Sequence, residues 1–447
     1  MRLTDIFSSK IDWTQFAPAL VMLLNTFIWY TLTYSVLSNI VDDLVISGAI
    51  SGEEKIAIFA MYFVGTASSA ILGAMFLRHK RETYLSLWML AGALMTALLV
   101  TVPENNMIIN SLISLFLGVS LGIGFPSCLA YFADATEIEI RGTCGGIAWG
   151  VVGIGTLVLA LLVGSFDIFS LLMTLAVWRA VGVVSFFLMT RRSRKVQQPN
   201  IQATYKSILS RRDVLQYLLP WIMLSLVNFT ETPIIENLFG ELYVIVGFIE
   251  FALIGIFALI GGIFADIVGR KRVIITGFVM LGIGYAMLSF SSEISFSQYL
   301  YVACDGVAWG MFSSVFLITL WGDLAQDGKE KYYVLGGLPF LLAGFLPILI
   351  ESLDIGDLAK LATAAFSLAS FFLFLAVLPL MYAPETLPDK IMKKRELENY
   401  LEKAQKEATK DQEKEAENSQ KEDADDGVEI EANPDLEEIL KQAEKYY

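Results

Sequence analysis

Histidine, cysteine and charged side chains are scarce in this chain of 447 residues. The one histidine is His79, and the three cysteines, Cys128, Cys144 and Cys304, lie in or at the ends of apolar segments without the spacing of metal ligands. The sequence therefore predicts no metal site, no disulfide framework and no Cys–His catalytic pair. A Gly-x-x-x-x-Gly-Lys-Ser/Thr loop is also missing, so nothing supports direct drive by ATP. We predict no cofactor and no nucleic-acid partner, and an enzyme is the least favoured class.

Apolar residues are abundant instead. They make up 55% of the chain, against 17% for charged residues, and the mean hydropathy is +0.59. This composition is too apolar for a soluble globular protein. Apolar stretches of roughly 20 residues recur, which is the length that a helix needs to cross about 30 Å of hydrocarbon. Barrel strands would alternate and be about half as long. The sequence predicts an all-α protein embedded in a lipid bilayer.

Twelve membrane-spanning helices are predicted from these stretches. No small-residue cleavage site follows the first of them, so we expect it to be retained. The predicted spans are 13–38, 55–77, 83–102, 107–133, 143–165, 168–190, 214–238, 242–265, 273–291, 296–322, 333–351 and 358–382.

Basic residues between the spans set the predicted orientation. Clusters at 78–81, 191–195, 269–272 and 393–395 fall on one side of the membrane, while the loops on the other side carry few basic residues. Basic loops stay in the cytoplasm. Both chain termini are therefore predicted to be cytoplasmic, in a protein of the cell membrane.

A weak internal repeat divides the chain into two halves. When the chain is shifted by 189 residues, "FAD" at 132–134 falls on "WGD" at 321–323. Many transporters are built from duplicated bundles, and we predict two pseudo-symmetric six-helix bundles. A polar tail follows them, with 20 acidic and 11 basic residues, and so −9 of the net charge of −14. The predicted parts are the first bundle at 1–190, a basic cytoplasmic linker at 191–213, the second bundle at 214–383 and the acidic cytoplasmic tail at 384–447.

A motif follows the eighth span, in the stretch "GGIFADIVGRKR" at 261–272. It matches, position by position, the signature Gly-x-x-x-Asp-x-x-Gly-Arg-Lys/Arg-basic of the major facilitator superfamily, which the sequence resembles over nearly its whole membrane region. A plain topogenic loop would need the basic residues but neither the aspartate nor both glycines. The matching residues are Gly262, Asp266, Gly269, Arg270, Lys271 and Arg272.

The resemblance implies that this loop packs against the other half and helps to close a cytoplasmic gate. The expected partner is the stretch "ADATEIEIRG" at 133–142 with the start of the fifth span, and its candidate gate residues are Asp134, Glu137, Arg141 and Gly142. The equivalent loop of the first half has Leu77 in place of the aspartate and Lys80 in place of the second glycine. The gate contacts of the two halves are therefore expected to be unequal.

Two further short stretches bear on the branch of the superfamily. "PETLP" at 384–388 resembles the element that ends the last span in the sugar-porter and organic-ion branches. "GVVGIGTLV" at 150–158 has Thr156 where drug–proton antiporters carry a proline. An efflux antiporter is therefore disfavoured.

Four ionisable residues lie deep in predicted spans: Arg179, Glu231, Glu250 and Asp305. Each costs about 2.5 to 3.5 kcal/mol at the centre of a membrane helix, so such groups usually face an aqueous cavity or a partner. The acids are candidates for proton coupling or for binding a cationic group, with structural hydrogen bonding as the alternative. For Arg179 a structural role is favoured. Asp305 heads the candidates, because Tyr301, Trp309 and Ser313 lie on the same helical face.

Two other spans carry polar and aromatic residues. The seventh has Asn228, Glu231 and Thr232 just before Pro233, which is expected to loosen its outer end into a gate. In the first span Asn25, Trp29 and Thr33 form one stripe, with Tyr30 and Tyr34 beside it. The resemblance implies that spans 1, 4, 7 and 10 line the cavity, so these residues are expected to face substrate. Helix packing is the alternative for the stripe.

The sequence is best interpreted as a secondary active transporter that works by alternating access. We expect a monomer that moves a small polar organic solute, with proton symport as the leading coupling because carboxylates are available. One alternative is a facilitator or exporter of cationic or amphiphilic compounds, in which Asp305 and Glu250 bind the charge directly. Another is a non-transporting membrane sensor that signals through its tail.

Overall fold

The computed structural model describes residues 11–76, 81–101, 106–191, 203–292, 294–325, 328–352, 358–388 and 391–393, together with residues 397, 401 and 404. Within these residues the chain is helical and contains no strand. The chain divides into a compact unit, Met1–Met392, and a second unit, Lys393–Tyr447. The compact unit therefore extends past residue 384, where the sequence places the start of the tail.

The first half of the chain folds into six crossings. Long apolar sequences with few internal charges form each of them, and Asp12, Asn106 and Asp167 cap three of the helix starts with their side chains. The helices are α2 (Trp13–Ile46), α3 (Gly52–Phe76), α4 (Arg81–Leu98) with η1 (Leu99–Thr101), α5 (Met107–Gly122) with α6 (Phe125–Asp134), α7 (Arg141–Val163) and α8 (Ile168–Thr190).

The second half repeats this plan after the short helix α9 (Tyr205–Leu209). The helices are α10 (Arg212–Phe239), η2 (Gly240–Leu242), α11 (Tyr243–Val268), α12 (Arg270–Ser291), α13 (Ser295–Met311) with the π-helical η3 (Phe312–Thr319) and α14 (Leu320–Leu324), α15 (Lys329–Ala343) with α16 (Leu346–Ser352), and α17 (Leu358–Tyr382).

The described helices account for twelve crossings. Eleven stretches are long and apolar enough to cross a membrane, but one of them, Arg212–Val268, is 57 residues long. As one helix it would measure roughly 85 Å, more than twice the hydrocarbon thickness. It divides at η2 into α10 and α11, each long enough to cross once. The predicted fold, an all-α membrane protein of two six-helix bundles, is confirmed.

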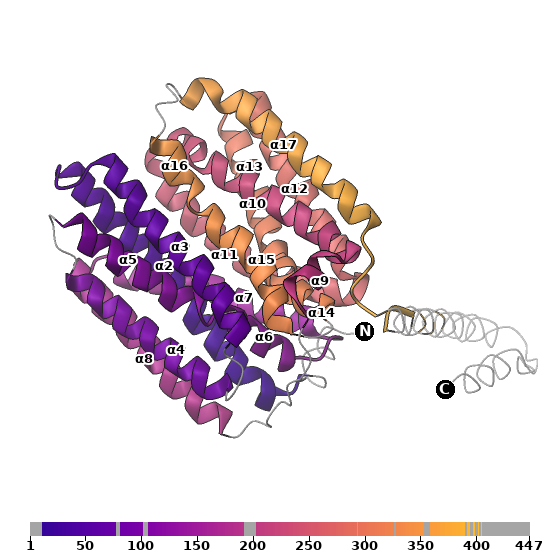
Figure 1. The fold of residues 1–447 in the computed structure, drawn as a ribbon. Helices are drawn as coiled ribbons and strands as arrows, with labels where there is room; N and C mark the ends of the chain where they lie inside the picture. The colour runs from indigo at the N-terminus through magenta and orange to yellow at the C-terminus, as the bar shows by residue number, and fades with distance from the viewer. Residues whose placement is uncertain are drawn as a thin grey trace, which may run out of the picture. The chain divides into compact units, whose positions relative to one another are not determined.

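The two halves lie side by side, the first from α2 to α8 and the second from α10 to α17 (Figure 1). They meet along α7 and α11, where glycines allow the backbones to touch. A Cβ atom added to Gly262 would lie 2.2 Å from the carbonyl oxygen of Gly142, and one added to Gly146 would lie 2.7 Å from that of Ala258. The absence of a side chain at Gly262 thus allows α11 to approach α7 closely.

Several crossings are interrupted where the sequence predicted continuous helices. The fourth crossing breaks at Gly124, and the eleventh at Gly344, each just before a proline that cannot donate a hydrogen bond. The tenth passes through π-helical turns over Phe312–Thr319. In contrast, α10 continues through Pro233 to Phe239, so the predicted loosening there does not end the helix.

Each end of the helix bundle holds its own group of ion pairs. We call the end that holds Arg81, Arg141 and Arg270 the basic end, and the end that holds Lys55 and Glu351 the opposite end. The basic end is the one for which the sequence predicts the cytoplasmic side.

Candidate functional site

A cavity of about 640 Å³ lies between the two halves of the helix bundle. This volume is within the range of small-molecule sites, roughly 300 to 1,000 Å³. Helices α2, α3 and α7 line it from the first half, and α10, α11, α13, η3, α15 and α16 from the second. The predicted site residues that line the cavity are Tyr30, Tyr34, Asn228, Thr232, Glu250, Tyr301, Asp305 and Trp309, together with Ser313.

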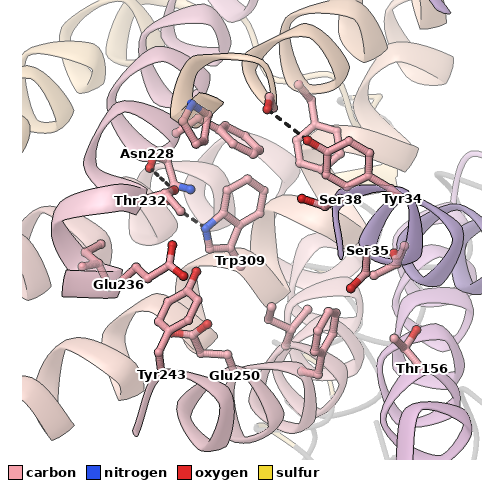
Figure 2. A pocket seen from close by; sticks show the side chains of 18 of the residues that line it. Tyr34, Ser35, Ser38, Thr156, Asn228, Thr232, Glu236, Tyr243, Glu250 and Trp309 are labelled. Carbon is pink, nitrogen blue, oxygen red and sulfur yellow. Dashed lines mark hydrogen bonds between the residues drawn. The ribbon is translucent and has the colours of Figure 1, made fainter. Parts of the chain in front are cut away.

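Hydrogen bonds fix the polar wall that α10 and α13 present to the cavity. The indole nitrogen of Trp309 donates to the side-chain oxygen of Asn228 at 3.2 Å, and the Thr232 hydroxyl donates to the Asn228 carbonyl at 3.0 Å. Figure 2 shows this group facing the helix that carries Tyr34. The Tyr34 hydroxyl donates across the halves to the carbonyl of Gly344 at 3.3 Å. The wall thus offers aromatic faces beside polar groups.

Glu250 and Asp305 are brought near each other by the close packing of α11 and α13. A Cβ atom on Gly306 would lie 2.4 Å from the Cβ atom of Leu253, so the two helices touch at this level. Asp305 immediately precedes Gly306, and Glu250 lies three residues before Leu253. The two carboxyl groups interact electrostatically, and Asp305 is 5% exposed.

Four predicted site residues do not line the cavity. Trp29 donates to the Thr96 hydroxyl at 2.7 Å, Asn25 binds α8, and Thr33 is buried. Glu231 is 8% exposed, and its Oε2 has no hydrogen-bond partner among the described residues. None of the three stripe residues of the first span lines the cavity, whereas Tyr30 and Tyr34 beside the stripe do.

Contacts with Arg179 determine the direction in which Asn25 and Trp29 point. Its guanidinium lies 4.5 Å from the ring centroid of Trp29 and 4.6 Å from that of Trp88. It donates to the side-chain oxygen of Asn25 and to the Thr26 hydroxyl, both at 2.9 Å. None of the described carboxylates forms an ion pair with Arg179. The arginine therefore ties α8 to α2 and α4, as the favoured structural interpretation expects.

A first prediction follows from this stacking. Arg179→Lys should lower the free energy of unfolding more than Arg179→Met, because an ammonium keeps the buried charge but loses the planar contact with both rings. Each cation–π contact is worth about 0.5 to 2 kcal/mol, whereas methionine fills the gap and packs on aromatic rings. Thermal unfolding of the purified variants tests the order. Greater stability of the lysine variant would show that the charge, not the stacking, is what matters.

An ion-pair group that the sequence did not indicate lies at the opposite end of the cavity. Lys55 on α3 pairs with Asp42 on α2 at 2.7 Å and with Glu351 on α16 at 3.0 Å. These residues join the two halves, and all three line the cavity. The lysine side chain is 18% exposed and the carboxylates are 40% and 42% exposed. Few basic residues occur in the loops of that side of the membrane. The presence of Lys55 there was the only feature of the sequence that could have indicated this group.

A second prediction concerns this group. Lys55→Met should make the cavity more accessible from the opposite end, because the two carboxylates lose the cation that joins the halves. A partly exposed ion pair contributes at most about 1 kcal/mol to the free energy of the closed arrangement, so the labelling rate should rise by several-fold and no more. The measurement is the labelling rate of a Ser35→Cys reporter in the cavity wall, with Lys55→Arg as the control that keeps the charge. An unchanged rate in Lys55→Met would contradict the prediction.

At the basic end, Asp266 caps a helix of the other half. Its carboxylate accepts the backbone N–H groups of Gly142 at 3.0 Å and Thr143 at 2.6 Å, and the Thr143 hydroxyl at 2.5 Å. These donors lie at the start of α7, where a negative charge interacts favourably with the helix dipole. The motif aspartate thus holds α11 against α7.

Asp323 joins the two halves beside this cap. It pairs with Arg141 of the first half and with Arg270 of the second, the latter at 3.0 Å. Arg270 also donates to Asp266 at 2.6 Å and to the Ile138 carbonyl at 2.6 Å. The side chains of Asp323 and Arg270 are fully buried.

The corresponding position of the first half holds a second cluster. Arg81 pairs with Asp134 at 2.6 Å and with Glu330 of the other half at 2.8 Å, and Lys329 also pairs with Asp134. The offset of 189 residues places Arg81 on Arg270 and Asp134 on Asp323, so the internal repeat recurs in the ion pairs. Residues 77 and 80, on which the expected inequality depends, lie outside the described residues.

The remaining motif residues shape the loop. Gly269 has φ of 103°, a conformation that favours glycine, and a Cβ atom there would lie 2.4 Å from Glu385. Glu385 accepts the backbone N–H groups of Arg270 at 2.8 Å and Lys271 at 3.1 Å. Arg272 and Glu137 are exposed. Because Glu385 belongs to "PETLP", that stretch closes the motif loop.

The cavity is therefore closed at one end. Buried ion pairs join the halves at the basic end, while partly exposed Asp42 and Glu351 line the cavity at the opposite end. None of the described side chains forms a group of three or more His, Cys, Asp or Glu placed to hold a metal ion.

Comparisons with known proteins agree with this architecture. The model of the Major Facilitator Superfamily matches residues 18–327. The human organic anion transporter MFSD10 (TETRAN) has a similar structure, with a TM-score of 0.58 and 16% identity, over 82% of this chain and 99% of that chain. The E. coli fucose:proton symporter FucP has a TM-score of 0.63 and 10% identity, over 83% of this chain and 99% of that one.

A third similar structure is the proton:xylose symporter XylE, with a TM-score of 0.60 and 13% identity, over 83% of this chain and 96% of that chain. No curated protein matches the sequence. At these sequence identities the structural similarity shows a shared fold alone.

Proposed function

Because the chain belongs to the Major Facilitator Superfamily, we propose that it is a secondary active transporter that moves a small polar organic solute across the cell membrane. Transport proceeds by alternating access and is coupled to protons in symport. The basic end is cytoplasmic, as are both termini, and the protein acts as a monomer.

The observation that carries this proposal is a cavity of about 640 Å³ between two bundles, joined at one end by buried ion pairs. Rocking of the bundles about the cavity would open the basic end and close the other. The groups that must separate are Asp323 from Arg141, Asp266 from the start of α7, and Arg81 from Glu330. At the opposite end, Lys55 already joins the halves through Asp42 and Glu351.

Proton coupling is assigned to Glu250 and Asp305. Two carboxylates that face each other in a low-dielectric cavity repel when both are ionised, and a shared proton removes that repulsion. Binding of a solute that requires the protonated pair then links solute entry to proton entry. Glu231 lies outside the cavity lining and is assigned a supporting role within the second bundle.

The experiment is a current measurement on proteoliposomes that contain the purified protein. Pools of sugars, carboxylates, amino acids and organic cations are added with and without an inward proton gradient. We expect one pool to give a current that the gradient increases. Flux that is independent of the gradient would indicate a facilitator instead, and the absence of flux with every pool would contradict transport.

Removal of the acidic tail separates a transporter from a sensor. A variant that ends at Met392, the last residue of the compact unit, should keep the solute-dependent current, because the cavity and both gates lie before that residue. A sensor that signals through its tail would lose its output. If thermal unfolding shows that the truncated protein is folded, loss of the current would contradict the assignment of this protein as a transporter.

A further inference from the structure

The charges that line the cavity are strongly unequal. Among the described residues, five carboxylates line it and Lys55 is the single cationic side chain. Lys55 already pairs with Asp42 and Glu351 at the opposite end. The lining carboxylates with which Lys55 forms no ion pair are Glu236, Glu250 and Asp305, from α10, α11 and α13.

Burial makes this inequality costly. Asp305 is 5% exposed, and in an apolar surrounding an ionised carboxylate without a counter-charge is strongly disfavoured. No described lysine or arginine forms an ion pair with Asp305 or Glu250. A positively charged ligand would supply the missing partner, whereas an anionic one would add to the repulsion.

An unpartnered hydroxyl on the facing wall points to a ligand independently of the acids. Thr156 on α7 lines the cavity and is 1% exposed, yet its hydroxyl has no hydrogen-bond partner among the described residues. A buried polar group without a partner is energetically unfavourable, because it loses its hydrogen bonds to water and gains none in return. Figure 2 shows Thr156 on a helix across the cavity from Glu250. A polar ligand that spans the cavity would satisfy it.

Aromatic rings complete the wall near the acids. Trp309 and Tyr243 lie beside Glu236 and Glu250 in Figure 2. A cation within about 6 Å of such ring faces is attracted to them, most strongly by tryptophan. The Trp309 indole is held in place by Asn228, so its ring is presented in a fixed orientation.

We propose that the solute of this transporter is an organic cation, bound between Glu250 and Asp305, with its charged group against Trp309 and a polar group at Thr156. The inference rests on the proposed function, since it takes this cavity as the transport site. It names the substrate class as amine, quaternary ammonium or guanidinium compounds of a size that fits about 640 Å³.

The charge balance agrees with symport. The pair formed by Glu250 and Asp305 carries two negative charges when it is ionised. One proton and one organic cation together neutralise it, so that both must be present before the loaded cavity is electrically balanced. Each transport cycle then carries two positive charges inward. If the solute binds without the proton, one negative charge on the pair stays uncompensated.

The test compares charged probes with uncharged counterparts of nearly the same shape. The cations are choline, tyramine and phenylguanidine, and the counterparts are dimethylbutanol, tyrosol and phenylurea. Binding to the purified full-length protein is measured by thermal stabilisation at millimolar concentrations, and transport by current from proteoliposomes. Glu250→Gln and Asp305→Asn are compared with Glu241→Gln, an exposed acid of the same half that does not line the cavity.

We expect at least one cation to stabilise the wild-type protein while its uncharged counterpart does not. Its affinity should fall by about tenfold or more in Glu250→Gln and Asp305→Asn and stay unchanged in Glu241→Gln. The inference is overturned if none of the three cations stabilises the protein, or if both cavity variants bind the cation as the wild type does.

The results also separate this inference from the proposed function. A proton-driven current with an uncharged solute, lost in Asp305→Asn, would leave the proposed transport in place and overturn the cationic substrate. Cation binding at Glu250 and Asp305 without any gradient-driven current would support the site and contradict the transport.

Discussion

Asp305→Asn is expected to abolish solute accumulation driven by a proton gradient. Asparagine keeps the shape and the hydrogen-bonding capacity of the side chain but cannot take up or release a proton. Because Asp305 is buried and lines the cavity with Glu250, its removal leaves Glu250 without the neighbour whose charge would link proton and solute binding. Uptake should fall to the level set by the solute gradient alone.

Exchange of solute across the membrane should persist in this variant at raised solute concentrations. The cavity wall formed by Trp309 and Asn228 is unchanged, and rocking of the bundles does not require the proton. Counterflow measured beside gradient-driven uptake distinguishes the two activities. Asp305→Glu, which restores a carboxyl group, should recover part of the coupling. Full solute accumulation by the Asp305→Asn variant would show that Asp305 is not part of the proton pathway.

Asp323→Ala is expected to have the second largest effect, on both stability and conformation. Asp323 is fully buried and is the shared partner of Arg141 and Arg270. Removing one member of a buried ion pair costs about 3 to 5 kcal/mol, because the remaining charges stay buried without compensation. That cost falls on the state in which the basic end is closed, so the variant should populate the state in which this end is open.

The measurements are thermal unfolding and the labelling rate of a reporter cysteine at Thr319, a buried residue whose hydroxyl approaches the Arg141 carbonyl at 3.5 Å. Asp213→Asn is the matched control, since the pair of Asp213 with Arg211 is about one quarter exposed and is expected to contribute at most about 1 kcal/mol. Labelling should rise in Asp323→Ala and not in the control. Equal effects in the two variants would show that Asp323 does not hold the basic end closed.

Most of the fold follows from the sequence, because each crossing needs a long apolar stretch and the ends of these stretches are marked by charge. The apolar pattern predicts that the first span ends at residue 38, whereas α2 continues to Ile46. Asp42 and Asp43 end the apolar pattern but not the helix, because Val41 and Leu44 on either side of them are still buried and continue its packed face. The interruptions near Gly124 and Gly344 were missed, because proline near the middle of an apolar stretch does not reveal whether the helix kinks or stops.

The candidate site was predictable only in part. Asp305 and Glu250 stood out because isolated charges in apolar helices are costly. The facing direction of Asn25 and Trp29 could not be read from their spacing, since a helix with polar residues on several sides does not show which neighbour it packs against. The contact of Arg179 with Trp29 decides that direction. The group around Lys55 was missed because its members are far apart in the sequence and lie at the ends of three different helices.

The motif at 261–272 was the strongest local signal, and its contacts follow the expectation closely for some positions. Asp266 and Gly262 both meet the start of α7, which is the partner that the resemblance implied. Glu385 and Asp323 as further partners of the motif could not be derived, because their positions depend on how the second half folds back on itself.

The most direct test of the account is the movement of protons that accompanies solute entry. Proteoliposomes loaded with a pH-sensitive dye are exposed, without an imposed proton gradient, to the solute pool that gives a current. The account predicts that solute entry acidifies the lumen with the wild-type protein and does not do so with Asp305→Asn. Solute entry through the wild-type protein without acidification would contradict proton symport by this cavity.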